Sequence, residues 1–228
     1  MATRICFLSR PDGDTMFKEI MVEFKYHNGF AISQKQKSIK ALHESINKID
    51  QTLKVLEVST KSTSSTGVAL SAFNLKFFDE KSGREYPIEN IFQSSKVFEH
   101  GGPYSDLLYV HPKDAKRDER LKNSGNLKSF QYDEMTWDLE PKTMFYDWIY
   151  ICSLYRNAEL SKRILDYNAF TDIEFNQKKS FNCQARSAAI FVSLIKKGIL
   201  EEVINDKEKF KKIYSVEEKD SVQGSLSF

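Results

Sequence analysis

The chain has 228 residues, 40% of them hydrophobic and 13% aromatic, which is typical of a folded protein with one sizeable core. Its 34 basic and 32 acidic residues give a net charge of +2, so charge alone does not indicate nucleic-acid binding. The three cysteines and four histidines lack metal-ligand spacing, no segment has the apolar length of a membrane span, and no secretion signal is evident. We therefore expect a cytoplasmic protein without metal, cofactor or membrane contact.

In chain order, residues 20–26 and 54–59 have the pattern of strands, and a helix is expected from about Gln34. Apolar residues recur along that helix at the spacing of one face: Ile39, Leu42, Ile46 and Ile49. Residues 61–67 are expected to form a polar loop and residues 68–78 an extended run. A turn at Lys81-Ser82-Gly83 then precedes a helix that can begin at Pro87.

The second half of the chain predicts mostly helices. A charged helix is expected over residues 115–125, ended by Gly125, and an apolar, central helix over residues 143–155. The segments that follow are a helix over residues 158–167, a polar and irregular stretch over residues 169–184, and a last helix over residues 185–197 that stops at Gly198.

Strands near the front and helices behind them, without a β-α-β alternation, predict an α+β fold. We expect a single domain over residues 1–204 that is mainly helical with a small sheet. Residues 205–228 form a charged tail, expected as a frayed helix or as disordered chain.

The segment from Pro87 to Gly102, PIENIFQSSKVFEHGG, carries the strongest chemical signal. If it is helical throughout, four polar side chains fall within a narrow arc: Glu89, Gln93, Lys96 and His100. Apolar residues cover most of the remaining circumference, so the polar stripe faces either a network of partners or a ligand cleft. An ordinary Glu–Lys pair on an amphipathic helix accounts for the stripe about equally well.

This segment resembles the hallmark of the NADAR, or YbiA-like, family. The stretch GREYPIENIFQSSKVF departs from the family at Asn90, where His is usual, and matches it at Gly83, Tyr86, Glu89, Gln93 and Lys96. Upstream, LSAFN is similar to a Ser-Asn-Phe motif on a strand, and Trp137 before an apolar helix also fits. The family's closing Asp near a Trp-Gly pair is missing. Residues 174–186 occupy that region, which leaves the second catalytic carboxylate open.

Further segments resemble the NADAR subgroup encoded beside DarT-type toxins: GFAISQKQKSI, LEVSTKS, LSAFNL, FQSSKVFEHGGPY, AKRDERL, AFTDIEFN and NCQARS. The resemblance extends over about residues 20–197. It implies a YbiA-like fold and an N-glycosidase that removes ADP-ribose from the exocyclic amino group of guanine in DNA. It also implies an antitoxin role, with ADP-ribosylated DNA as the substrate and a cognate DarT-type toxin as a candidate partner.

Cleavage at an anomeric carbon passes through an oxocarbenium-like state, which needs a carboxylate and a proton donor. We assign the carboxylate to Glu89. Lys96 is the cationic partner, and the sequence leaves three roles open for it: orienting Glu89, donating a proton, or attacking the ribose carbon as an amine. A purely structural salt bridge to Glu89 carries nearly equal weight.

Other residues are candidates for binding the nucleotide or the base. Lysines and serines near a helix start and in a loop suit a diphosphate: Ser33, Lys35, Lys61 and Ser62. Close backbone approach and a ring are offered by Gly101, Gly102 and Tyr104. Trp137 is expected either to stack on a base or to lie in the core. The remaining candidates are Ser71, Phe73, Asn74, Gln93, Asp172 and Asn182.

Arg117 and Arg120, on the charged helix, are expected to contact solvent or DNA phosphate. Three alternatives to the main hypothesis stay open. The chain can act on a small phosphorylated metabolite, or it can bind ADP-ribosylated DNA or the toxin without hydrolysis. A structural or interaction protein is least favoured, because the polar stripe lies on an otherwise apolar helix.

Overall fold

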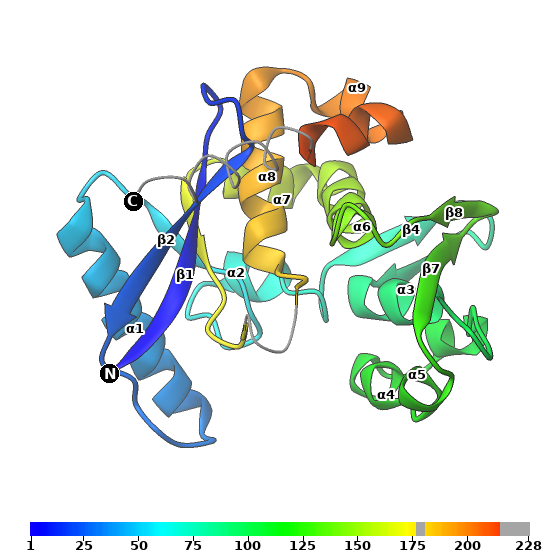
Figure 1. Cartoon of the computed structure of the whole chain (residues 1–228). Helices are drawn as coiled ribbons and strands as arrows, with labels where there is room; N and C mark the ends of the chain where they lie inside the picture. The colour runs from blue at the N-terminus through cyan, green and yellow to red at the C-terminus, as the bar shows by residue number, and fades with distance from the viewer. Residues whose placement is uncertain (177–180, 215–228) are drawn as a thin grey trace, which may run out of the picture. The chain divides into compact units, whose positions relative to one another are not determined.

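The computed structural model describes residues 1–176 and 181–214, and their contacts group them into two compact units (Figure 1). Unit 1 comprises Met1–Ser71 together with the chain from Ala158 onward, and unit 2 comprises Ala72–Asn157. Each unit contains both helices and strands, so the predicted α+β class is confirmed. The boundary between a domain over residues 1–204 and a tail stays a prediction.

Unit 1 is built on a four-stranded sheet of order β2-β1-β9-β3. The strands are β1 (Ala2–Ser9), β2 (Phe17–Phe24), β3 (Val55–Glu57) and β9 (Ala169–Thr171). β1 pairs antiparallel with β2 and with β9, whereas β3 and β9 run parallel. Because their carboxyl ends meet at one edge of the sheet, Glu57 lies opposite Thr171.

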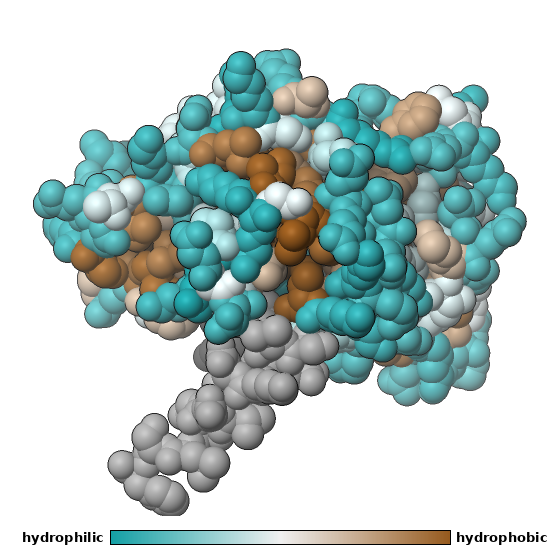
Figure 2. Space-filling model, turned by 90° about the horizontal axis from the view of Figure 1, so that it is seen from above, coloured by the Kyte–Doolittle hydropathy of each residue, from teal (hydrophilic) through white to brown (hydrophobic). Residues whose placement is uncertain are grey.

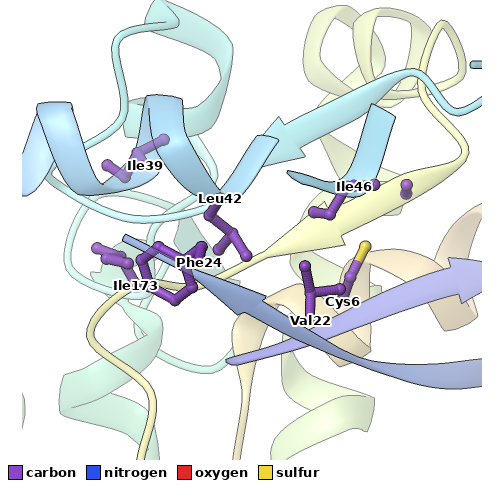
Figure 3. Packing of buried hydrophobic residues seen from close by; sticks show 8 residues of the cluster. Cys6, Val22, Phe24, Ile39, Leu42, Ile46 and Ile173 are labelled. Atoms are coloured by element: carbon purple, nitrogen blue, oxygen red, sulfur yellow. The ribbon is translucent and has the colours of Figure 1, made fainter. Parts of the chain in front are cut away.

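Helix α1 (Ile32–Ile49) covers one face of this sheet with the predicted apolar stripe. Figure 3 shows the packed side chains, which come from β1, β2 and α1: Cys6, Val22, Phe24, Ile39, Leu42 and Ile46. Burying an aliphatic or aromatic side chain of this size contributes about 1.5–3 kcal/mol. Ile49, expected in the stripe, is the exception and is 62% exposed, because it is the last residue of α1.

Helix α8 (Gln184–Lys197) contacts β1, β2 and β9 and ends at Gly198, whose φ of 72° is the left-handed conformation of a C-terminal cap. The smaller helices of unit 1 are α2 (Ser65–Ala69), α7 (Ala158–Ile164) and α9 (Leu200–Ile204). Residues 207–214 are also helical, and Phe210 among them is buried. Residues 215–228 of the expected tail lie outside the described residues.

Unit 2 contains a two-stranded and a three-stranded sheet. The strands are β4 (Lys76–Asp79), β5 (Arg84–Pro87), β6 (Lys96–Phe98), β7 (Leu127–Tyr132) and β8 (Met135–Trp137). The helices are α3 (Ile88–Ser94), the 3-10 helix η1 (Ser105–Tyr109), α4 (Pro112–Arg117), α5 (Arg120–Asn123) and α6 (Met144–Arg156). An aromatic core joins α3, β7 and α6, where the rings of Phe92, Phe130 and Phe145 lie 4.9–6.4 Å apart.

The expected helix from Pro87 to His100 is wrong beyond Ser94. The Ser94 and Ser95 hydroxyls both donate to the carbonyl of Ile91, at 3.1 and 2.7 Å, and so compete with the helical pattern. The Ser95 carbonyl accepts from the N–H of Gln131, and residues 96–98 then pair with β7. Partners distant in the sequence therefore turn the second half of the segment into a strand.

Three further expectations are corrected. The stretch over residues 169–184 was expected to be too polar for the core, yet β9 is fully buried because it pairs on both edges. The extended run expected over residues 68–78 begins inside α2 and becomes a strand only at β4. The charged helix expected over residues 115–125 is divided into α4 and α5 at Asp118.

Strands β1, β5, β7 and β8 were not predicted. On the face of the molecule drawn in Figure 2, hydrophilic residues predominate, and hydrophobic ones are visible in smaller areas. Within the described ranges, no helix combines the length and the hydropathy that a transmembrane span requires.

Candidate functional site

Glu89 lies in the first turn of α3 and is 5% exposed. Its backbone N–H donates to the carbonyl of Ala72 at 3.0 Å, which fixes the start of the helix. Its carboxylate Oε1 accepts from the Gln93 side-chain amide at 2.8 Å and lies 3.7 Å from the Lys116 Nζ. The apolar neighbours Ile88 and Ile91 are fully buried, so the Lys116 ammonium and the Gln93 amide approach this carboxylate in a largely apolar environment.

Lys96 is not on this helix but begins β6, so the predicted helical arc from Glu89 to Lys96 is wrong. Its Nζ lies over the ring of Phe92, 4.8 Å from the ring centroid. Burial lowers the pKa of Lys96 to about 8; the charge of Glu89 opposes this shift, and that of Lys116 adds to it. The ion pair of Glu89 is made with Lys116, and the described residues include none for Lys96.

Gln93 completes the cluster around Glu89. Its amide nitrogen donates to Glu89, but its carbonyl Oε1 is buried and has no hydrogen-bond partner among the described residues. A buried acceptor without a donor is costly, and such groups are rare in folded proteins. Phe73 also lies near Lys116, since the Lys116 Nζ is 5.4 Å from the centroid of the Phe73 ring. The structure thus brings together the predicted residues Phe73, Glu89, Gln93 and Lys96, and adds Lys116.

Gly102 packs against the strand that carries Lys96. Its φ is +88°, and a Cβ there would lie 2.2 Å from the backbone oxygen of Lys96. Gly101 is equally tight, because a Cβ would lie 2.3 Å from the hydroxyl of Tyr104. The two glycines therefore allow close approach within the chain itself, and their predicted contact with a ligand stays a prediction.

Tyr104 and Arg120 are held by other side chains. The Tyr104 hydroxyl bonds the Ser124 hydroxyl at 2.5 Å, and the Arg120 guanidinium lies 4.5 Å from the Tyr104 ring centroid. Arg120 also pairs with Asp106 at 2.6 Å and with Asp118 at 2.9 Å. The Arg120 side chain is 42% exposed despite these two ion pairs, so contact with solvent fits the structure, and contact with DNA phosphate stays a prediction. Arg117 is exposed.

Trp137 is 2% exposed and packs against Phe145 and Trp148, with ring centroids 5.6 and 4.9 Å away. This placement fits the core alternative rather than a ring stacked on a base. Asn74 is the remaining predicted ligand-binding residue of unit 2. It is exposed and follows the half-buried Phe73.

Unit 1 contains a buried glutamate, Glu57, which was not predicted. Glu57 is 2% exposed at the end of β3 and accepts three hydrogen bonds. The donors are the hydroxyl of Ser59 at 2.7 Å, the hydroxyl of Thr171 at 2.7 Å and the N–H of Ile173 at 2.9 Å. Burial raises the pKa of Glu57, and the nearby charge of Asp172 raises it further.

His43 extends this network from α1, because its Nε2 lies 3.0 Å from the Thr171 hydroxyl oxygen. Burial lowers the pKa of His43 to about 4, so the imidazole is neutral at pH 7. Asp172, a predicted site residue, follows β9 and is half-buried. It accepts from the Gln184 side chain at 3.1 Å and from the N–H of Glu174 at 3.0 Å, and burial raises its pKa.

The remaining candidates of unit 1 are placed as follows. Ser33 is exposed at the start of α1, and the Lys35 ammonium is engaged with Tyr26 at 2.8 Å and Glu174 at 3.2 Å. Lys61 is half-buried in the loop before α2, whereas Ser62 is buried there. The other two are Ser71, which is buried and whose hydroxyl has no partner among the described residues, and Asn182, which is half-buried.

Residues 177–180 of the stretch expected to hold the second carboxylate lie outside the described residues. In the described ranges, no three His, Cys, Asp or Glu side chains gather as metal ligands. That the protein works without a metal stays a prediction.

A family model of DarT1-associated NADAR antitoxins matches residues 2–224. The chain belongs to this family. The NADAR assignment made from the sequence is therefore confirmed, and one family model spans nearly the whole chain, including both units. A comparison with the curated proteins gave no match.

The departure from the usual NADAR pattern at Asn90 has a structural explanation. Asn90 is fully buried on α3, and its amide donates to the carbonyls of Leu107 at 2.7 Å and Val110 at 2.9 Å. In this NADAR antitoxin the residue therefore holds η1 and the approach to α4 against α3. Its own carbonyl oxygen has no hydrogen-bond partner in the described part of the chain.

The sequence did not lead to a prediction for Lys116 or for Glu57, and the reasons differ. Lys116 lies 27 positions after Glu89 in a run of ordinary charges, and no spacing rule connects the two. Glu57 offered a usable signal, because it is a charged residue inside the apolar strand pattern VLEV. A charge in a buried strand has to find partners, and that alone marks the position.

Proposed function

We propose that this NADAR antitoxin is an N-glycosidase that removes ADP-ribose from guanine bases in DNA and so reverses the action of a DarT-type toxin. Family membership supports an ADP-ribosyl glycohydrolase type of activity and an association with the DarT1 toxin system. The single observation that supports this chemistry best is the cluster in unit 2, where a buried carboxylate and a lysine of lowered pKa lie close enough to influence each other.

The lowered pKa of Lys96 favours its role as an amine nucleophile. A change from 10.5 to about 8 multiplies the uncharged fraction at neutral pH by about 300. A lysine that is desolvated and lies near another cation is a recognised form of activated nucleophile. The ring of Phe92 beneath the Nζ excludes water from one side of the amine.

The proposed reaction has two steps. The Lys96 amine attacks the ribose carbon that is bonded to the guanine amino nitrogen, and the bond from that carbon to guanine breaks. Glu89 stabilises the positive charge that develops on the ribose, accepts the proton that the amine loses, and returns it to the departing guanine nitrogen. Water then replaces Lys96 on the ribose carbon, which frees ADP-ribose and restores the amine.

Gln93 is the proposed binding group of the cluster in unit 2. Its buried, unpaired carbonyl is suited to accept a hydrogen bond from a ribose hydroxyl or a base N–H. The diphosphate candidates of unit 1 stay predictions, and among them the Lys35 ammonium already has two partners. Only local contact with DNA is expected from a net charge of +2.

The decisive experiment incubates the protein with a DNA strand that carries one ADP-ribosylated guanine. Release of ADP-ribose, followed by chromatography, together with restored guanine in the strand, is the expected result. Tight binding without release would instead support a non-hydrolytic binder. Release only from a small ribosylated phosphate compound would support the metabolite alternative.

Borohydride tests the role of Lys96. Opening of the ribose ring converts the covalent adduct into an imine, and reduction during turnover should attach ADP-ribose to Lys96, as detected by mass spectrometry. Lys96→Ala should give no adduct. If nothing is trapped and Lys96→Arg still turns over, Lys96 is an electrostatic partner or a proton donor and not a nucleophile.

A further inference from the structure

Lys116 is a surface lysine that reaches a buried carboxylate. Its side chain is 57% exposed, whereas that of Glu89 is 7% exposed, and the two approach to 3.7 Å. Its Nζ also lies 5.4 Å from the centroid of the Phe73 ring. Lys113, on the same helix, is exposed, and the described part of the chain contains no ion-pair partner for it. Contact with a buried carboxylate therefore distinguishes Lys116 from Lys113, its neighbour on α4.

Several contacts fix the helix that carries Lys116. The Asn90 amide binds the carbonyls of Leu107 and Val110, just before α4 begins. The His111 ring then accepts the N–H of Lys113 at 3.2 Å, and Ala115 is buried against the unit. Because Asn90 follows Glu89 directly on α3, the same helix presents the carboxylate and holds the segment that leads to its lysine.

Glu89 pairs with Lys116, and the charges of these two groups act on Lys96 in opposite directions. If both lysines are charged, the three groups carry a net positive charge, and loss of one proton relieves the repulsion. Burial penalises the charged form more for half-buried Lys96 than for exposed Lys116. Two other charged groups near β6, Glu99 and Lys128, pair with each other at 3.0 Å. The protonation state of Lys96 therefore depends mainly on its burial and on the charges of Glu89 and Lys116.

We propose that Lys116 is a positioning residue of this site: it holds the Glu89 carboxylate in an ion pair and, as a second cation, favours the uncharged amine form of Lys96. Its importance for turnover rests on the proposed function, in which Lys96 is the nucleophile. Its electrostatic effect on Lys96 does not, because that effect exists in the protein without substrate.

The test is a titration of Lys96 in the full chain, observed as the 13Cε chemical shift of labelled lysine and assigned with Lys96→Arg. Lys116→Met keeps most of the side-chain length and removes the charge, so the midpoint should move to higher pH by about half a pH unit, as expected for the loss of one nearby charge. Glu89→Gln should move it to lower pH. Lys113→Met, on the same helix, should leave it unchanged, and an unmoved midpoint in Lys116→Met would overturn the proposal.

Turnover supplies a second readout. In Lys116→Met the pH profile of kcat should move to higher pH with the titration, whereas Lys116→Arg, which keeps the charge, should retain the wild-type profile. A shift caused by lost folding is recognised by comparing thermal unfolding of the variants. If the titration moves as expected but no variant releases ADP-ribose, the proposed function fails and the role of Lys116 toward Lys96 stands. If wild type turns over and Lys116→Met changes neither curve, the role of Lys116 fails alone.

Discussion

Among the described residues, each unit contains one almost fully buried glutamate, and the two have opposite kinds of partner. Glu57 in unit 1 accepts three hydrogen bonds from neutral donors, with a neutral imidazole behind one of them. Glu89 in unit 2 has one amide donor and a lysine at 3.7 Å, beside a second lysine and an unpaired amide carbonyl. Both glutamates are therefore buried, and they differ in whether their partners are neutral donors or a charged lysine.

The comparison indicates how to separate a structural carboxyl group from a reactive one. Neutral donors that occupy both oxygens leave little room for a substrate, so Glu57 joins β3 to β9 and to the loop after β3. A carboxylate that lies near two lysines and an unsatisfied acceptor can exchange partners when a ligand binds. We accordingly expect changes at Glu89 to affect turnover and changes at Glu57 to affect stability.

The largest effect is expected from Glu89→Gln. This change keeps the shape and removes the charge, and loss of transition-state charge stabilisation typically costs about 100-fold or more. Release of ADP-ribose from modified DNA measures the effect, and thermal unfolding should show little change in stability. Turnover within a few fold of wild type would remove Glu89 from the mechanism.

Glu57→Ala should instead destabilise the fold. It leaves the Ser59 and Thr171 hydroxyls and the Ile173 N–H without their acceptor, and an orphaned buried donor costs about 1–3 kcal/mol. Urea unfolding measures the loss. Glu44→Ala is the matched control, because its exposed pair with Lys40 at 3.9 Å should contribute less than about 0.5 kcal/mol. Equal losses for the two variants would contradict the assigned role of Glu57.

The most gradual effect is expected from Glu57→Gln, as a change in the free energy of unfolding with pH. Because burial raises the pKa of Glu57 in the folded state, the unfolded chain ionises first as pH rises above 4.5, and wild-type stability is lost progressively toward the folded pKa. Glutamine cannot ionise, and its amide can donate to Thr171, whose hydroxyl then donates to neutral His43. Between the two pKa values the free energy of unfolding should shift in favour of glutamine by about 1.4 kcal/mol for each pH unit at most. A pH-independent difference would show that Glu57 has the same pKa in both states.

Local patterns predicted α1, α6, α8 and the cap at Gly198, since each has an apolar face or a terminator in its own sequence. They did not predict β9, whose burial depends on pairing with β1 and β3, or the change from helix to strand at Ser95, which depends on Gln131. The same division holds for the site. Family motifs identified Glu89, Gln93 and Lys96, whereas Lys116 comes from a separate helix and becomes visible only when α4 is placed beside α3.

The close packing at Gly102 makes the position of the Lys96 amine depend on a residue six places further along the chain. A side chain at position 102 would press on the backbone oxygen of Lys96, and β6 would have to shift by a fraction of an ångström or more. A displacement of that size is small for a fold but large for the nucleophile that we propose Lys96 to be, because its amine would have to approach the ribose carbon along a defined line. In a library of random variants, position 102 should therefore behave as part of the site. Substitutions there should yield soluble protein in which the Lys96 amine is displaced and turnover is lost.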